Sequence, residues 1–296
     1  MSDVVPRVSI GMPVYNGEHY IREALDSLLG QTFADFELMI SDNASTDKTE
    51  AICRDYAGRD RRVCYHRNEH NLGLVANYNR VFEMARGEYF KWASSNDVCE
   101  PTMLARCIEM LDNNPDMVLC YARTVLFDEL SRTEAEYNDH LTLTCESPCE
   151  RVKGLVSGLR LNNAMNGLIR TEALRRTDLI ADFIASDVNL LMQLSLLGKF
   201  GEVPEPLFRR RVHPQEGTRN GDAERLLKIY NPTSHRSRTF TFWRLNLEHL
   251  RSVWRSPIGV GGKLNLTGFL IRKLFWDRRM LAAELTHAGK VRQGRT

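Results

Sequence analysis

Short apolar runs alternate with helical patterns in the first third of the chain. Four runs, at 7–12, 36–40, 63–66 and 89–93, have the length and the β-branched or aromatic content of buried strands. Between them, apolar residues recur at helical spacing, as they do over 21–29. Strands that recur about every 27 residues with helices between them predict right-handed crossovers. We therefore expect an α/β fold whose mainly parallel sheet is flanked by helices.

The pattern is less regular after the fourth run. A strand is predicted over 117–127 and a brief one over 167–169. The segment 128–148 is polar and has no periodicity, so we expect a variable loop that covers a site. Asp187 precedes a helical pattern with a broad apolar face, which ends at Gly198.

The basic charge of the chain is concentrated at its C-terminal end. From Asn231 onward there are 13 Lys and Arg against 3 Asp and Glu, a net charge of +10, although the whole chain carries only +2. Trp243, Trp254 and Trp276 are interleaved with these basic residues in a helical pattern. Such an extension suits an anionic membrane surface, and the alternatives are a helical subdomain packed on the core or a homodimer interface. Nucleic-acid binding is not expected, because no known reading motif accompanies the charge.

Composition indicates the compartment. No stretch approaches the ~20 apolar residues of a membrane-spanning helix, and the N-terminus lacks the features of a secretory signal. We expect a cytoplasmic protein, either soluble or peripheral on the inner membrane face. Seven cysteines form no CxxC pair, which favours reduced thiols over the alternative of a zinc site on Cys145 and Cys149.

Polar side chains follow the predicted strands at their C-terminal ends. Residues 41–47 follow the second strand, and Ser94-Ser95-Asn96-Asp97 follow the fourth. In an open α/β sheet, ligands bind outside the carboxyl ends of the strands. Neither GxGxxG nor GxxxxGK[ST] is present, so the ordinary dinucleotide and P-loop sites are not expected.

Four linked blocks resemble family 2 glycosyltransferases of the GT-A fold. The blocks read VSIGMPVYN at 8–16, SDNASTD at 41–47, NLG at 71–73 and ARGEY at 85–89. Their order and spacing match the family over roughly Val8 to Pro214. The resemblance implies a Rossmann-like GT-A catalytic domain over 1–218, followed by a basic helical extension over 219–296. It also implies inverting transfer of a single sugar from a nucleotide-diphosphate sugar to an acceptor hydroxyl, in the assembly of cell-surface polysaccharide or glycolipid.

The resemblance assigns the nucleotide site. Pro13, Tyr15, Asn16 and Glu18 would form the first nucleotide-contacting loop, and Asp42 would accept a hydrogen bond from the base. A carboxylate suits the N–H of uracil, thymine or guanine and offers nothing to cytosine N3, so a UDP-sugar is expected, with dTDP or GDP as alternatives.

Asn71, Asn77 and Asp42 could instead have purely structural roles. Asn71 and Asn77 would also touch the ligand if the resemblance holds, but they suit a turn and a helix surface equally well. Asp42 could instead cap a helix.

The metal motif departs from the family. Ser94, Ser95 and Asn96 stand where the family shows Asp-x-Asp, and Asp97 follows. Ser94 and Ser95 would line the donor site, while Asn96 and Asp97, with His213, would hold Mn²⁺ or Mg²⁺ against the diphosphate. Fewer carboxylates predict weak metal binding. The alternative is a non-catalytic protein that binds a nucleotide sugar or a glycan.

The resemblance also assigns the catalytic residues. Asp187 stands at the place of the catalytic base, which an inverting displacement needs beside the acceptor hydroxyl. It suits a helix N-terminus as well, and the two roles are compatible. Arg211, in the closing segment with His213, would contact the diphosphate.

Overall fold

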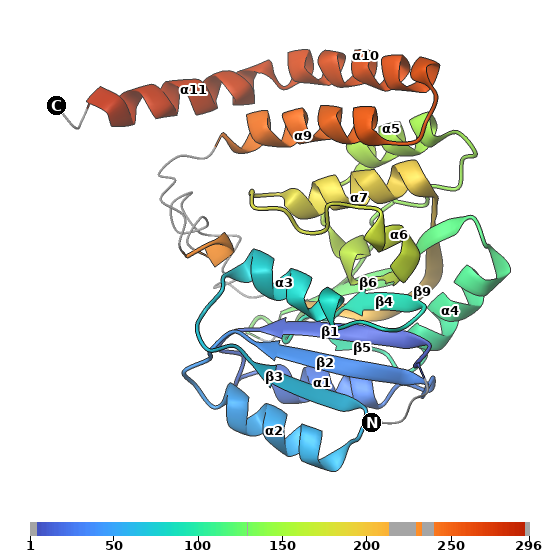
Figure 1. Cartoon of the computed structure of the whole chain (residues 1–296), viewed down its shortest axis with the longest axis vertical. Helices are drawn as coiled ribbons and strands as arrows, with labels where there is room; N and C mark the ends of the chain where they lie inside the picture. Colours follow the sequence, from blue (N-terminus) through green and yellow to red (C-terminus); the bar gives the residue numbers. More distant parts are fainter. Residues whose placement is uncertain (1–4, 129, 213–228, 233–239, 294–296) are drawn as a thin grey trace.

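The computed structural model describes residues 5–128, 130–212, 229–232 and 240–293 (Figure 1). Its core is a nine-stranded sheet in the order β3-β2-β1-β4-β8-β6-β9-β5, with β7 paired to β6. Helices flank this sheet, and a helical layer completes the C-terminal end, as expected. No helix in the described ranges is long and apolar enough to cross a membrane.

The first half of the sheet is parallel. It consists of β1 (Val8–Val14), β2 (Phe36–Asp42), β3 (Val63–Arg67) and β4 (Tyr89–Trp92), with β1 between β2 and β4. Helices α1 (Ile21–Leu29), α2 (Thr49–Arg59) and α3 (Leu74–Glu83) connect these strands. α3 lies so close to β1 that a Cβ on Gly11 would stand 2.7 Å from Val81. The four strands end at one edge of the sheet, which we call the carboxyl edge.

The second half of the sheet is mixed. β8 (Leu168–Arg170) pairs antiparallel with both β4 and β6 (Met117–Asp128), and β9 (Lys199–Arg211) runs parallel to β6. The short β5 (Val98–Cys99) pairs antiparallel with β9, and α4 (Met103–Asn113) follows it. The parallel arrangement predicted from the sequence therefore describes β1 to β4, whereas later strands enter in both directions.

The segment 128–148 is not simply a loop. It contains β7 (Thr133–Tyr137), which forms an antiparallel hairpin with the end of β6, and Leu143 forms an isolated bridge with Phe200. The residues of β7 are almost all exposed, so the strand has no apolar face that periodicity could reveal.

Strand β9 is also absent from the sequence-based prediction, because it contains Pro204 and Pro206. Its register against β6 shifts at this point, where Ala122 opposes Val203 and Thr124 opposes Phe208. Proline is tolerated at such an irregularity, since no ladder hydrogen bond is required from its nitrogen.

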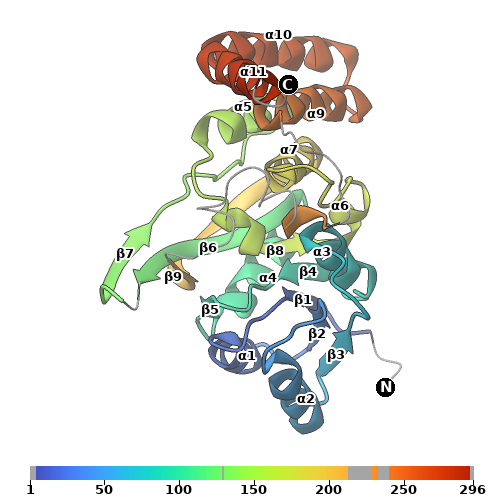
Figure 2. The same ribbon diagram turned by 90° about the vertical axis from the view of Figure 1, so that its left-hand side faces the viewer.

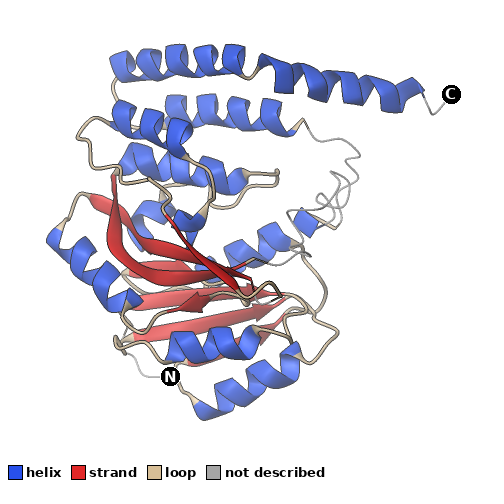
Figure 3. Ribbon diagram, turned by 180° about the vertical axis from the view of Figure 1, so that it is seen from behind, coloured by secondary structure: helices blue, strands red, loops and turns tan. Residues whose placement is uncertain are grey.

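The C-terminal helices share a core with the sheet. The smaller helices α5 (Pro148–Gly158), η1 (Asn163–Asn166) and α6 (Thr171–Arg175) precede α7 (Ser186–Leu197). α9 (Thr241–Arg255) packs on α7, α10 (Val260–Trp276) packs on α9 and α5, and α11 (Arg278–Gln293) follows as part of the outermost layer (Figures 1 and 2). Figure 3 shows this layer at the end opposite to α1 and α2. The predicted boundary at 218/219 lies outside the described residues, so the division remains a prediction.

His249 on α9 makes this layer sensitive to acid. Its side chain is buried, and neither ring nitrogen has a hydrogen-bond partner in the described part of the chain. Burial, with a smaller contribution from Lys273, lowers the pKa of His249 to about 3. The folded protein therefore holds a neutral imidazole.

Acidification should accordingly cost more stability in the wild type than in His249→Leu. Between about pH 6.5 and pH 3 the unfolded chain takes up a proton that the folded chain refuses, so the free energy of unfolding falls. At pH 5 the loss is about 2 kcal/mol relative to pH 7. Urea unfolding of both proteins at the two pH values measures it, and equal losses would contradict the assignment.

Candidate functional site

Two loops at the carboxyl edge are joined by hydrogen bonds. Asn16, which has φ 52°, accepts a hydrogen bond from Thr46 N–H at 2.8 Å through its side chain. Glu18 accepts one from Lys48 N–H at 3.0 Å, and its own N–H donates to Asp47 at 3.0 Å. Asn16 and Glu18 therefore tie the loop after β1 to the loop after β2.

Two further residues of the predicted nucleotide loop lie beside this junction. Pro13 lies on β1 opposite Ser41, and Tyr15 leaves 51% of its side chain exposed at the end of the strand. Tyr15 is thus an accessible aromatic ring at the carboxyl edge.

The Asp42 carboxylate is enclosed by protein groups. It is 0% exposed, and one oxygen accepts the Ser45 N–H at 2.8 Å. The other oxygen accepts the Tyr65 hydroxyl at 2.7 Å and Arg67 Nη1 at 3.0 Å. Burial and this bond to Asp42 raise the pKa of Tyr65. The partner Arg67 is itself partly exposed.

The two asparagines hold the edge together from within. Asn77 is 3% exposed, and its amide bonds Ser41 and Asn68, so the structure places it in the interior and not on the helix surface considered from the sequence. Asn71 accepts hydrogen bonds from Asn43 and from Gly73 N–H, each at 2.8 Å. Both support the loops and do not present their side-chain oxygens to a ligand.

Arg211 lies behind the loop that follows β4. It is 1% exposed, and its Nε donates to the Asn96 carbonyl at 2.9 Å, while its backbone N–H donates to Asp97 Oδ1 at 2.9 Å. Its guanidinium pairs with Glu23. The predicted contact of Arg211 with a diphosphate is therefore not supported, since the side chain anchors the loop from the buried side.

A cavity of about 410 Å³ opens between this loop and the start of α7. It brings together Ser94, Asn96, Asp97 and Asp187, which the sequence places almost a hundred residues apart. Ser95 belongs to the same loop but does not line the cavity. The other lining residues are Leu74, Tyr78, Trp92, Asn162, Met165, Asn166, Ile180, Ile184, Ala185, Ser186, Val188, Arg210 and Tyr230.

Asp187 lies in the first turn of α7. Asn162 Nδ2 donates to one oxygen of its carboxylate at 2.6 Å. Ala185, with φ 67°, turns the chain into the helix, whose N-terminus favours an anion. Asn162 Oδ1 and Ser186 Oγ are buried and have no partner among the described residues.

Arg210 is the cation that the sequence analysis missed. Side chains alternate along β9, so Arg210 faces the cavity while Arg211 faces the opposite side. Its Nη1 donates to Asn163 Oδ1 at 2.8 Å, and Asn163 Nδ2 donates to Asp139 Oδ2 at 3.2 Å. The alternation of the Arg209-Arg210-Arg211 run would have revealed this, had the strand been predicted.

Tyr78 forms another part of the wall that the sequence analysis did not single out. Burial raises its pKa to about 12, and the negative charges of Asp187 and Asp97 add to that shift. It therefore remains a neutral phenol at physiological pH.

The residues expected to hold a metal are only partly visible. His213 lies outside the described residues. In the described ranges no group of three or more His, Cys, Asp or Glu side chains could hold an ion. Asn96 accepts the Ser94 hydroxyl, and Asp97 is the one carboxylate of the loop. These oxygens fit a hard divalent cation in kind, but they require further oxygen ligands. All seven cysteines are free.

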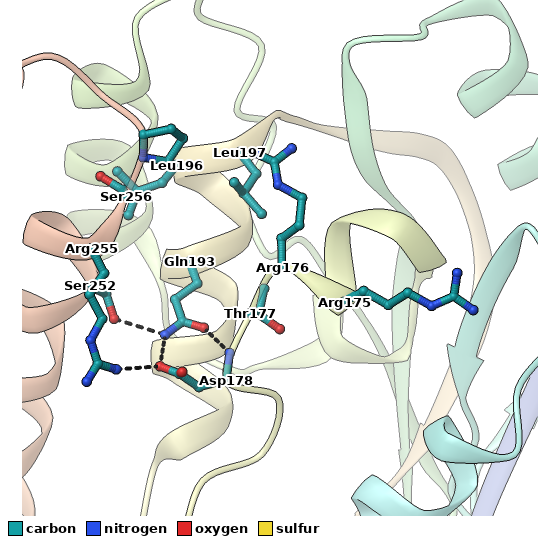
Figure 4. Close-up of a pocket in the computed structure, with 11 residues that line it drawn as sticks. Arg175, Arg176, Thr177, Asp178, Gln193, Leu196, Leu197, Ser252, Arg255 and Ser256 are labelled. Atoms are coloured by element: carbon teal, nitrogen blue, oxygen red, sulfur yellow. Dashed lines mark hydrogen bonds and ion pairs between the residues drawn. The ribbon is translucent and has the colours of Figure 1, made fainter.

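A second cavity, of about 440 Å³, lies between α6, α7 and the end of α9 (Figure 4). None of the residues predicted from the sequence lines it. Gln193 hydrogen-bonds Asp178 and Ser252, and Arg255 pairs with Asp178 at 3.6 Å. These polar groups join α9 to α7 and to the segment after α6, so we regard this cavity as a packing gap between helices and not as a ligand site.

Comparison with known proteins identifies the family. The model of glycosyl transferase family 2 matches residues 9–180. An uncharacterized glycosyltransferase of Methanocaldococcus jannaschii is 33% identical over 126 residues, 42% of this chain and 43% of that protein. One from Haemophilus influenzae is 26% identical over 217 residues, 70% of this chain and 66% of that protein. The chain spans less than half the length of the archaeal relative and of several other curated relatives.

Solved structures share the fold. Staphylococcus aureus TarS 1–349 in complex with UDP-GlcNAc has a TM-score of 0.67 at 18% identity, covering 92% of this chain and 74% of that chain. The mannosyltransferase PcManGT of Pyrobaculum calidifontis, in complex with GDP-Man and Mn²⁺, has a TM-score of 0.57 at 16% identity, covering 97% and 76%. The family and the GT-A fold expected from the sequence are confirmed.

Replacing Asp139 should reveal the cost of burying its carboxyl group. Asp139 is 2% exposed, its Oδ1 lacks a described partner, and burial raises its pKa to about 6. Because the folded protein holds this proton longer than the unfolded chain, its contribution to stability falls as the pH rises from about 4 to 6. The advantage of Asp139→Asn over the wild type should be about 2 kcal/mol greater at pH 7.5 than at pH 4.5. Chemical denaturation at both pH values measures this, and an advantage independent of pH would refute it.

Proposed function

The chain belongs to glycosyl transferase family 2, and we propose that it moves a single sugar from a nucleotide-diphosphate sugar to an acceptor hydroxyl, with inversion at the anomeric carbon. The observation that carries this proposal is the cavity shared by the loop after β4 and by Asp187. One wall offers the groups expected at a diphosphate, and the other offers a carboxylate.

Asp187 would serve as the base. As the acceptor oxygen bonds to the anomeric carbon and the bond to the leaving phosphate breaks, a carboxylate must take the hydroxyl proton. Asn162 holds one oxygen of Asp187, and Asp187 lines the cavity.

The nucleoside would lie along the carboxyl edge. Pro13, Tyr15, Asn16 and Glu18 line that edge, where Tyr15 offers a face for stacking. Asp42 would contact the base after exchange with Arg67, while Asn71 and Asn77 would support the loops. The donor proposed is a UDP-sugar, with dTDP or GDP as alternatives. The complexes of TarS with UDP-GlcNAc and of PcManGT with GDP-Man support a nucleotide sugar in general.

The diphosphate would lie between the loop after β4 and Arg210. Ser94 and Ser95 belong to the loop, Asn96 and Asp97 with His213 would hold Mn²⁺ or Mg²⁺, and the Arg210 guanidinium adds positive charge. A divalent cation, when bound, stabilises the charge of the leaving diphosphate. The Mn²⁺ present with GDP-Man in PcManGT supports such an ion.

The acceptor is proposed to be a glycan or a lipid-linked glycan in the assembly of cell-surface polysaccharide or glycolipid, on the cytoplasmic side. A second candidate function is non-catalytic binding of a nucleotide sugar or a glycan. It is favoured by the loop after β4, which supplies a single carboxylate, Asp97.

Asp187→Asn should abolish transfer and leave donor affinity nearly unchanged. The amide keeps the shape of the side chain but cannot take a proton, which costs on the order of 10²–10⁴-fold in turnover. Asp182→Asn is the matched control, since Asp182 is exposed on the same segment and does not line the cavity. Donor hydrolysis and calorimetry measure the two properties, and full turnover by Asp187→Asn would exclude the base.

Titration with UDP, GDP, dTDP and CDP, each with and without Mn²⁺, should identify the donor class. We expect UDP to bind most tightly, CDP not to bind, and Mn²⁺ to strengthen binding, because Asn96 and Asp97 need diphosphate oxygens to complete the ion's ligands. Nucleotide binding without donor hydrolysis, with or without the ion, would favour the binding protein over the enzyme.

A further inference from the structure

Helix α10 is apolar on two sides, and the protein covers only one of them. Leu266, Phe269 and Leu270 are buried in the core that α10 shares with α7. A second row consists of Val260, Leu264, Ile271 and Phe275, which are 67%, 59%, 55% and 65% exposed. Steps of four, seven and four residues place this row on a single face, which we call the outer face of α10.

Exposed apolar side chains are concentrated in this layer. Of the fifteen large apolar residues exposed in the described part of the chain, all but Val5, Tyr15 and Leu130 lie between Phe240 and Leu285. Exposed apolar surface of this extent marks a docking site. Figures 1 and 3 show α10 and α11 as the outermost layer of the molecule.

We propose that the outer face of α10 lies flat on an anionic lipid surface. Arg272 on α10 and Arg279 in the first turn of α11 are exposed, and neither is paired with a described acidic side chain. Between Val260 and Leu285, five Lys and Arg residues stand against two acidic residues, Asp277 and Glu284. A second copy of this chain would set these like charges against each other, whereas anionic lipid head groups would neutralise them.

The helix would lie in the plane of the interface. No described helix can cross a membrane, and α10 is held parallel to the layer of α9 beneath it. Apolar side chains that enter the boundary between head groups and acyl chains, with basic residues beside them, are typical of such a helix.

This placement deepens the proposed function, on which it rests for the acceptor. α10 packs on α9, and α9 packs on α7, whose first turn carries Asp187. Two helix layers, at about 8–10 Å each, separate the lipid surface from the level of the base. A glycan linked to a lipid would therefore extend a short distance from the surface to reach the cavity.

Flotation with vesicles tests the proposal without requiring transfer. The full chain is mixed with vesicles of phosphatidylcholine alone or with about 30% phosphatidylglycerol, at about 0.1 M salt. We expect binding to the anionic vesicles only. Ile271→Ser combined with Phe275→Ser should reduce it at least tenfold, whereas the matched control Leu130→Ser, on the distant hairpin, should not.

Charge is tested in the same assay. Arg272→Gln and Arg279→Gln should each weaken binding about fivefold. Exposed Arg61→Gln, in the turn between α2 and β3, should have no effect, because these elements lie at the end opposite to α10 (Figure 1). Sedimentation of the lipid-free protein measures whether it forms a dimer. The proposal is overturned if anionic vesicles do not bind, if the double serine variant binds like the wild type, or if the outer face instead forms a dimer that this variant dissociates.

Donor hydrolysis by the double serine variant separates the two proposals. The outer face does not line the cavity, so hydrolysis should stay at the wild-type rate while vesicle binding is lost. If the wild type shows no donor hydrolysis but still binds vesicles, the proposed enzyme activity is refuted and the proposed lipid-binding surface is retained.

Discussion

The buried guanidinium of Arg211 is the contact on which the cavity depends. Its central carbon lies 4.2 Å from the ring centroid of Tyr20 and 4.5 Å from that of Phe127, and its nitrogens bond the Asn96 carbonyl and Glu23. A buried charge without partners would cost several kcal/mol, so the loop after β4, the start of α1 and the end of β9 are held in one arrangement. The side chains of Asn96 and Asp97 can then face the cavity, because the backbone of their loop is anchored from behind.

Because side chains alternate along β9, Arg210 and Arg211 lie on opposite faces of the strand and have different roles. Arg211 anchors the loop, and Arg210, one residue earlier, supplies charge to the cavity. Two successive asparagines serve two carboxylates in a similar way, since Asn162 bonds Asp187 and Asn163 bonds Asp139. Of these two carboxylates, Asp187 lines the cavity, whereas Asp139 is buried with a pKa of about 6. Accessibility therefore favours Asp187 as the proton acceptor.

Strong apolar periodicity predicted the parallel strands. The family resemblance assigned Asp187 and the loop after β4 to one site, and both line the same cavity. The sequence did not predict β7, whose side chains are exposed, or β9, whose prolines occupy an irregularity in pairing. The error at Arg211 follows from the second omission, since a strand was needed to tell which arginine faces which side. Asn77 was misplaced because a buried amide network is invisible to periodicity.

The packing of the C-terminal helices explains the inner row of α10 but not its apolar outer face. α7 carries the catalytic candidate at its first turn and is buried along almost its whole length, so α9 must cover it. α9 in turn needs α10, whose inner row enters the same core. Core packing accounts for that inner row and not for the outer one, which gains nothing from the fold while it faces water. An apolar row that packing does not require, in a layer whose Arg272 and Arg279 pair with no described acidic side chain, is better explained by an external surface than by the stability of the protein itself.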